Sequence, residues 1–305
     1  MANDIKRLIV KMMGPLALAC VRSNIHIFPF LMARIALSNI SHHPRHFVDK
    51  TRFGSEISGY TGHLLDCHIL LFKEWEPVIT QWIEERLEEG DTFIDVGANI
   101  GYYSLLASKL VGTKGQVVAI EASPTMFQSL QENLSRNEAQ NVRSVNIAAS
   151  DHSGSIELFR GPPENPAETT TESSLGFELE CVVPTEPLSQ LIKVEEFKCA
   201  RLVKMDIEGA EWVALKGLVP LFKHAREDLE FIVETNCWPS EKEGSHAADI
   251  ISLMAEAGYI PYQIENVYTF APYFRRVDIP RPKRVRGQVT ERCDLIFSKA
   301  DKEEL

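Results

Sequence analysis

A glycine-rich turn with an acid in front of it is the strongest chemical signal in the sequence. It reads Asp95-Val-Gly97-Ala-Asn99-Ile-Gly101 and stands between an apolar run and a helical pattern. Glycines let the backbone bend sharply and approach a ligand, and the following helix N-terminus offers free N–H groups. The G-x-G-x-x-G spacing of dinucleotide enzymes is missing, and the acid would repel a pyrophosphate. The turn instead suits a cationic cofactor such as S-adenosylmethionine, and favours a methyltransferase over a dehydrogenase.

A second acid lies at the spacing expected for a ribose contact. Glu121 ends the next apolar run, 20 residues after Gly101, where a carboxylate can accept hydrogen bonds from both ribose hydroxyls. The third apolar run ends in Ala149-Ser150-Asp151, from which a side chain or a backbone amide can read an adenine edge. Asp-His-Ser-Gly is also ordinary turn composition, so an adenine contact and a simple turn both remain open here.

Three more acids follow the fourth apolar run, in Asp206-Ile-Glu208-Gly-Ala-Glu211. A helix dipole accounts for Glu208 and Glu211 but not for Asp206, which lies at a strand end in the crevice where open α/β sheets bind ligands. Methyl transfer to a hydroxyl requires alignment and the removal of one proton, and Asp206, Glu208 or the strand-end Glu234 are the candidate bases. Alternatively, Asp206 and Glu234 could hold Mg²⁺ together with Asn236, because hard oxygen ligands suit that ion.

The elements around these residues predict an α/β fold. A helix over residues 76–87 leads into short apolar runs that alternate with helical patterns, which is typical of a parallel sheet covered by helices on both faces. The runs expected to form strands are 92–96, 116–121, 142–149, 202–206, 231–234, 259–264 and 294–298.

Two segments interrupt this alternation. Residues 154–187 are rich in Pro, Thr, Glu and Ser and are expected to form an inserted hairpin and loop. Residues 265–290 form a basic, aromatic loop with Tyr268, Tyr273 and Phe274, and six of its cations fall between residues 275 and 286. This loop is either a solvated connection or a mobile cap that recognises an anionic or sugar-bearing substrate.

Residues 1–50 are expected to form a helical extension or cap. Apolar residues recur at helical spacing over residues 5–16, which fits a helix packed on the domain or, alternatively, one lying on a membrane surface. The uncharged run over residues 12–21 is too short to span a bilayer. A net charge of −11 argues against nucleic-acid binding. Six separated cysteines without a C-x-x-C pair indicate reduced thiols in the cytoplasm.

Taken together, these motifs resemble the FkbM-type S-adenosylmethionine-dependent methyltransferases. The resemblance runs from about residue 52 to residue 238. The glycine turn and the Asp206-to-Glu211 motif are its specific parts, and Trp75-Glu76-Pro77, Glu121-Ala-Ser-Pro124, Asn133 and Ala149-Ser-Asp151 extend it.

The resemblance implies a class I methyltransferase fold, which is a Rossmann-like, doubly wound, seven-stranded sheet whose last strand is antiparallel. It also implies which residues hold the cofactor. Asp95, Gly97, Asn99 and Gly101 would line the methionine half, Glu121 would take the ribose, Ser150 and Asp151 would lie near adenine, and Ser123 and Asp206 would complete the site.

The resulting prediction is a methyltransferase domain in residues 51–305. It would methylate a hydroxyl on a small sugar-bearing or polyhydroxylated natural product, with S-adenosylmethionine as donor. Transfer to nitrogen, or cofactor binding without catalysis, are the alternatives. The expected partner is a small-molecule acceptor, sugar-bearing or anionic, with no nucleic acid and no membrane span, and a homo-oligomer is left open.

Overall fold

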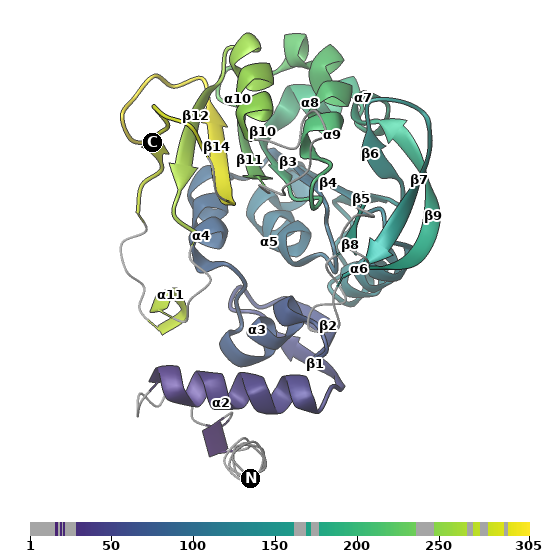
Figure 1. Ribbon diagram of the computed structural model, residues 1–305, viewed down its shortest axis with the longest axis vertical. Coiled ribbons are helices and arrows are strands. Elements are labelled where there is room, and N and C mark those ends of the chain that lie inside the picture. Colours follow the sequence, from purple (N-terminus) through teal and green to yellow (C-terminus); the bar gives the residue numbers. More distant parts are fainter. Residues whose placement is uncertain are drawn as a thin grey trace.

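A mixed eight-stranded sheet forms the centre of the computed structural model (Figure 1). The structure describes residues 16, 17, 19, 21, 29–161, 169–171, 177–235, 247–266, 271–274, 280–289 and 292–305. Within this part of the chain, no helix is long and apolar enough to cross a membrane. The strands of the main sheet are β3 (Thr92–Val96), β4 (Gln116–Ile120), β5 (Val142–Val145), β10 (Ala200–Met205), β11 (Glu230–Thr235), β12 (Ile260–Ile264), β13 (Lys283–Arg284) and β14 (Cys293–Ser298).

The strand order identifies the fold. The order is β13-β12-β14-β11-β10-β3-β4-β5, in which β5, β4, β3, β10 and β11 are mutually parallel and β14 is antiparallel to both of its neighbours. The chain reverses its direction of winding between β3 and β10, which is where open α/β sheets bind ligands. The expected doubly wound, seven-stranded sheet with an antiparallel last strand is therefore confirmed, and the two-residue β13 adds an eighth strand at one edge.

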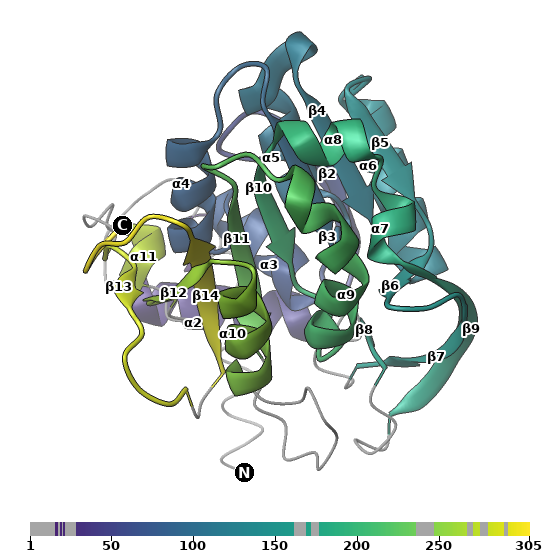
Figure 2. The same cartoon turned by 90° about the horizontal axis from the view of Figure 1, so that it is seen from above.

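Helices cover both faces of the main sheet (Figure 2). Alternating side chains of the strands face these two helical layers. Phe93 and Leu202 pack under α4, α5 and α6, whereas Ile94 and Val203 pack under α7 to α10. Burial on both faces explains why these strands read as continuous apolar runs. The covering helices are α4 (Pro77–Arg86), α5 (Tyr102–Val111) and α6 (Pro124–Arg136) on one face, and α7 (Leu188–Leu191), α8 (Val194–Cys199), α9 (Glu211–Leu218) and α10 (Ala247–Glu256) on the other.

The prediction of a single strand over residues 142–149 was wrong. The segment forms β5 and then a separate strand, β6 (Ala148–Ser150), which belongs to a four-stranded sheet of order β6-β9-β7-β8. The side chain of Asn146 donates to the carbonyls of Glu121 and Ala122 (2.8 and 3.0 Å), and β6 then pairs with the distant β9. The other strands of this small sheet are β7 (Gly154–Arg160), β8 (Thr169–Thr170) and β9 (Glu178–Pro187).

The N-terminal elements lie at one end of the molecule, below the main sheet in Figure 1. The side chain of Asn133 on α6 joins them to the glycine turn, because it donates to Ser58 O and to Ile100 O (3.2 and 2.9 Å). Most of the helical pattern expected over residues 5–16 lies outside the described residues. The elements are α2 (Pro29–His42), β1 (His46–Lys50), β2 (Glu56–Tyr60) and α3 (Leu64–Phe72), and the short η1 (Gly112–Lys114), η3 (Val219–His224) and α11 (Ala271–Phe274) occur elsewhere.

Candidate active site at the carboxyl edge of the sheet

The glycine turn runs directly against the end of β10. Gly97, Asn99 and Gly101 all have positive φ angles (87°, 50° and 90°), and Asn is one of the few other residues that tolerates this conformation. A Cβ atom on Gly97 would lie 1.8 Å from the carbonyl oxygen of Asp206, so no side chain fits there. The turn and the end of β10 therefore share one wall, which brings the predicted cofactor residues beside the predicted acids.

Asp95 has an unused carboxylate oxygen at the base of this turn. Its side chain is 1% exposed, and one oxygen accepts a hydrogen bond from Ser104 Oγ at 2.6 Å. The other oxygen, Oδ1, is buried and has no partner. Burial raises the pKa of Asp95, since the charged form loses water. A buried acceptor without a donor fits the ammonium group of a cationic cofactor, in agreement with the chemistry expected from the sequence.

Glu121 and Ser123 form one hydrogen-bonded group with the turn. The Glu121 carboxylate accepts from the amides of Asn99 and Ser123, both at 2.8 Å. Burial raises its pKa to about 7. Ser123 is also the N-cap of α6, where its hydroxyl oxygen accepts from Met126 N at 3.3 Å. The structure therefore brings together the residues predicted for the methionine half and the ribose.

Ser150 and Asp151, which were predicted to lie near adenine, are directed elsewhere. The carbonyl of Ser150 lies against α9, where a Cβ on Gly217 would be 1.9 Å from it. Asp151 pairs with His152 Nδ1 at 2.7 Å and with Lys216 Nζ at 2.9 Å, and these contacts lower its pKa. Within the described residues, no hydrogen bond joins either side chain to Glu121. Their adenine role stays a prediction.

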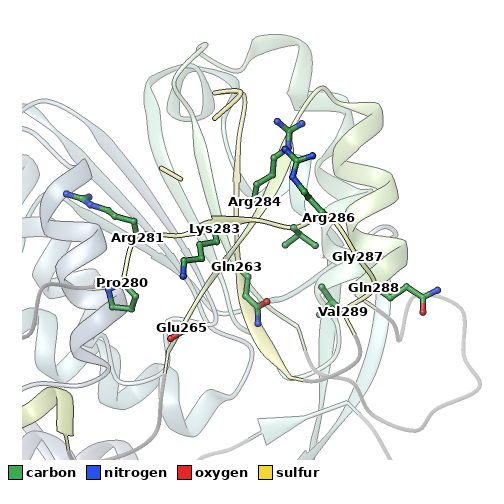
Figure 3. Close-up of a pocket in the computed structure, with 11 residues that line it drawn as sticks. Gln263, Glu265, Pro280, Arg281, Lys283, Arg284, Arg286, Gly287, Gln288 and Val289 are labelled. Carbon is green, nitrogen blue, oxygen red and sulfur yellow. The ribbon is translucent and has the colours of Figure 1, made fainter. Parts of the chain in front are cut away.

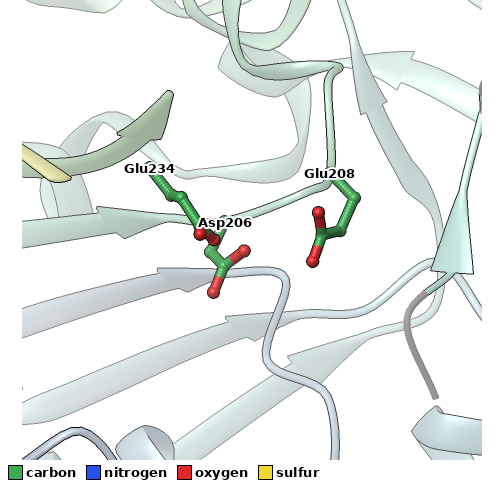
Figure 4. A group of neighbouring side chains, drawn as sticks. All are labelled: Asp206, Glu208 and Glu234. Carbon is green, nitrogen blue, oxygen red and sulfur yellow. The ribbon is translucent and has the colours of Figure 1, made fainter. Parts of the chain in front are cut away.

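The three predicted catalytic acids do meet at one point (Figure 4). Carboxylate oxygens of Asp206, Glu208 and Glu234 lie within 4.8 Å of one another. Asp206 and Glu234 share a hydrogen bond. Burial, together with the negative charge of Asp206, raises the pKa of Glu234 well above its ordinary value. Burial also disfavours the charged form of Asp206, but the attraction of Lys204, the hydrogen bonds from Glu234 and Lys204 and the charge of Arg292 together outweigh it and hold the pKa of Asp206 low. The two pKa values are therefore shifted in opposite directions, so Asp206 favours its ionised form and Glu234 its protonated form.

Two cations balance this cluster. Lys204 Nζ donates to Asp206 at 2.8 Å, is only 5% exposed, and lies 4.8 Å from the centre of the Tyr103 ring. Arg292 Nε donates to Glu234 at 2.6 Å, and its Nη2 lies 3.8 Å from Glu208. Sequence reasoning missed Arg292, because it precedes β14 and only the sheet order places that strand beside β11.

Hydrogen bonds from two other elements hold the loop that carries Glu208 in place. Glu208 itself has a positive φ of 50°, which is uncommon for a residue other than glycine. The Glu211 carboxylate accepts from the amides of Ile207 and Gly209, each at 3.0 Å. Thr170, on β8, donates to the carbonyl of Glu208 at 3.0 Å. Glu211, at the start of α9, therefore stabilises the loop that carries Glu208. Thr170 brings the small sheet into contact with the same loop.

Glu76 is a second residue that sequence reasoning left without a role. It is 6% exposed and has a φ of 39° just before α4. Its carboxylate accepts from Tyr103 Oη at 2.6 Å and from Asn266 Nδ2 at 2.9 Å. Asn266 also donates to Asp294 at 3.0 Å, and Asp294 lies opposite Glu234 in the sheet register. Burial raises the pKa of Asp294 to about 7. A buried polar network therefore backs the acid cluster.

A family model described as the methyltransferase FkbM domain matches residues 95–261, which is more than half of the chain. The chain belongs to this family. It is thus an S-adenosylmethionine-dependent methyltransferase, and the matched residues contain the glycine turn, Glu121 and all three acids of the cluster.

Individual relatives are more distant. The chain is 29% identical over 185 residues to hexuronic acid methyltransferase AglP of Haloferax volcanii, covering 60% of this chain and 69% of that protein. It is 37% identical over 62 residues to protein-L-isoaspartate O-methyltransferase of Methanococcus maripaludis, covering 20% and 29%. A solved structure of methyltransferase FkbM from Methylobacillus flagellatus aligns over 93% of this chain and 58% of that one, with 14% identity and a TM-score of 0.41. The chain therefore spans less than two thirds of that structure.

The acid cluster of this FkbM-family protein does not fit Mg²⁺ in its present form. Magnesium prefers an octahedral set of oxygen ligands and keeps several waters. Here Asp206 pairs with Lys204 at 2.8 Å, and Glu234 accepts a hydrogen bond from Arg292. Asn236, the third predicted ligand, lies outside the described residues. Both acids would have to give up these cationic partners to bind the ion.

The basic segment predicted as a substrate cap borders a pocket of about 370 Å³ beside β12 and β13 (Figure 3). Three of its described cations have acidic partners: Arg281 pairs with Glu85 at 2.7 Å, Arg284 with Asp301 and Arg286 with Glu303. Tyr268, Arg275 and Arg276 lie outside the described residues. Tyr273 and Phe274, predicted as stacking surfaces, instead pack against a ring of α3. The pocket is lined by Gln263, Glu265, Pro280, Arg281, Lys283, Arg284, Val285, Arg286, Gly287, Gln288 and Val289.

Proposed function

We propose that this protein transfers a methyl group from S-adenosylmethionine to a hydroxyl oxygen of a small, sugar-bearing acceptor. The contact between the glycine turn and Asp206 supports this proposal most directly, because it makes the cofactor cradle and the acid cluster two sides of one site. A methyl donor held at Gly97 would face the cluster, which is where an acceptor must approach. Alignment of donor and acceptor supplies most of the rate effect in such a displacement.

Asp95 and Glu121 are the proposed hydrogen-bond acceptors for the cofactor. Oδ1 of Asp95, which has no partner, would accept from the ammonium group of the cofactor, and Glu121 would accept from the ribose hydroxyls. The bound cofactor supplies an electrophilic methyl group on a sulfonium. The chain itself orients that group and keeps water away, since Asp95 and Glu121 are nearly fully buried.

Glu208 is the best candidate for the general base. The pKa of Glu234 is raised well above its ordinary value, which favours its protonated form, and Lys204 helps to hold the pKa of Asp206 low, so both are poorly placed to take up another proton. Glu208 is 17% exposed and stands at the edge of the cluster, with Arg292 at 3.8 Å. Asp206 and Glu234 would then orient the acceptor hydroxyl, while Glu208 takes its proton.

The proposed class of acceptor is based on the similarity to AglP and not on the pocket beside β12 and β13. AglP is a hexuronic acid methyltransferase, and it is 29% identical to this chain over 185 residues. Arg292 is 43% exposed beside the acids and offers a cation to the carboxylate of a sugar acid. We therefore place sugar acids first among the acceptors, and other polyhydroxylated molecules second.

The test is an acceptor panel with purified protein and methyl-labelled S-adenosylmethionine. Methyl glucuronide, methyl glucoside and glucosamine compare an acid, a neutral sugar and an amine, and NMR of the labelled methyl separates an ether from an amine product. Glu208→Gln should lower kcat by about 10²-fold or more. Glu227→Gln, an exposed acid at 94% exposure, is the matched control. Transfer only to the glucosamine nitrogen would contradict O-methylation, and full activity of Glu208→Gln would exclude it as the base.

A further inference from the structure

The small sheet brings one carboxylate to the cofactor end of the main sheet. Glu180 of β9 accepts a hydrogen bond from Ser123 Oγ at 2.9 Å, across 57 residues of sequence. The amide of the same Ser123 donates to Glu121 at 2.8 Å. Glu121 and Glu180 therefore flank a single residue at the start of α6, although they come from different sheets.

This arrangement of two acids is electrostatically unfavourable without a ligand. Neither Glu121 nor Glu180 forms an ion pair within the part of the chain that the structure describes. Burial is the main cause of the raised pKa of Glu121, and the negative charge of Glu180 adds to it. The second oxygen of Glu180 makes no hydrogen bond to any described residue. The N-cap of α6 does not require Glu180 either, because Ser123 supplies the capping oxygen itself.

A group with two adjacent donors would satisfy both acids. A ribose offers two neighbouring hydroxyls, and each Glu121 oxygen is already shared with one backbone amide. We propose that Glu180 is a second ribose-binding residue of the cofactor site, contributed by the inserted small sheet beside Glu121. This inference rests on the proposed function, since it takes S-adenosylmethionine as the ligand.

The proposal assigns the small sheet a role in cofactor binding. Among the residues predicted for the adenosine end, the carbonyl of Ser150 and the side chain of Asp151 contact α9. Strand β6, which carries Ser150, pairs in parallel with β9, so the same sheet that turns Asp151 away holds Glu180 at the start of α6. Two carboxylates at the ribose would also repel nucleotides that carry a 2′-phosphate, which adds to the discrimination against dinucleotide cofactors.

Calorimetric titration with S-adenosylmethionine and S-adenosylhomocysteine tests this assignment. We expect Glu180→Ala to weaken both ligands by about 10-fold, as for the loss of one charge-assisted hydrogen bond. Glu178→Gln is the matched control, because Glu178 is exposed on the same strand and should bind both ligands like the wild type. The melting temperatures of both variants should match that of the wild type, since Glu180 is only half-buried on β9 of the small sheet. Competition by adenosine, 2′-deoxyadenosine and 3′-deoxyadenosine then locates the contact: the preference for adenosine over at least one of the two deoxynucleosides should shrink in Glu180→Ala.

The outcomes separate this inference from the proposed function. If the wild type binds neither ligand, the cofactor assignment itself fails. If the wild type binds both and Glu180→Ala binds them equally well, Glu180 has no role in the site while the methyltransferase proposal stands. If binding weakens but the preferences for adenosine over 2′-deoxyadenosine and over 3′-deoxyadenosine are both unchanged, the contact is not to the ribose hydroxyls and the assignment is overturned.

Discussion

Replacing Lys204 by methionine tests the electrostatic balance of the acid cluster. Lys204 is a buried cation beside Asp206 at 2.8 Å, and Glu76 and Asp95 also favour its charged form. At an effective dielectric constant of about 20, this separation corresponds to about 6 kcal/mol of attraction to Asp206. Removing one member of a buried pair typically costs about 3–5 kcal/mol, because the partner is left uncompensated. We expect Lys204→Met to lower the free energy of unfolding by that amount at pH 7.

Urea denaturation at pH 7 and pH 4 measures this effect and its sign. The pKa of Asp206 lies below its ordinary value in the folded protein, so the pair stabilises fully above the unfolded pKa of about 4 and loses its effect as the pH falls toward the folded value. The difference between wild type and Lys204→Met should therefore shrink at pH 4. Lys198→Met is the control, since its pair with the 81% exposed Glu195 should contribute less than about 1 kcal/mol. Equal losses in the two variants at pH 7 would refute the reasoning.

Three further outcomes follow from the geometry. Gly97→Ala should abolish cofactor binding and lower the melting temperature strongly, because the added Cβ would meet the carbonyl oxygen of Asp206. Gly90→Ala should cost only the backbone strain, since Gly90 also has a positive φ but a Cβ there would have nothing within 4 Å. Equal melting curves of the two variants would contradict the proposed clash. The affinity for S-adenosylmethionine should rise between pH 6 and pH 8 as Glu121 loses its proton, and calorimetry in two buffers should detect proton release. Glu211→Ala should lower the free energy of unfolding by about 1–3 kcal/mol, because the partly buried amides of Ile207 and Gly209 lose their acceptor, and an unchanged denaturation midpoint would argue against these hydrogen bonds.

Much of the fold could be predicted because local signals agree with the tertiary structure. Strand β3 is mostly apolar, is buried at every position, and ends at a turn whose glycines have positive φ. Strands β4, β10 and β11 likewise have apolar, buried centres. The error at residues 142–149 has a different origin. Apolar residues recur through both halves of that segment, but the partner of its second half is β9, where Ala148 pairs with Thr185, and no local signal shows that pairing.

The candidate site divides in the same way. The glycine turn, Glu121 and Asp206 follow strand ends, so the fold class alone places them together. The roles of Arg292, Asp294 and Glu76 could not be predicted from local motifs, because each reaches the site from a segment far away in the sequence.

The most direct test of the central claim is calorimetric titration of the wild type and Asp95→Asn with S-adenosylmethionine and S-adenosylhomocysteine. Asparagine keeps an oxygen for Ser104 but removes the charge that faces the cofactor. The account predicts that the wild type binds both ligands and that the variant binds them more weakly by about 1.5–3 kcal/mol, or roughly 10- to 150-fold, without loss of thermal stability. A wild type that binds neither ligand, or a variant that binds both as tightly as the wild type, would contradict it.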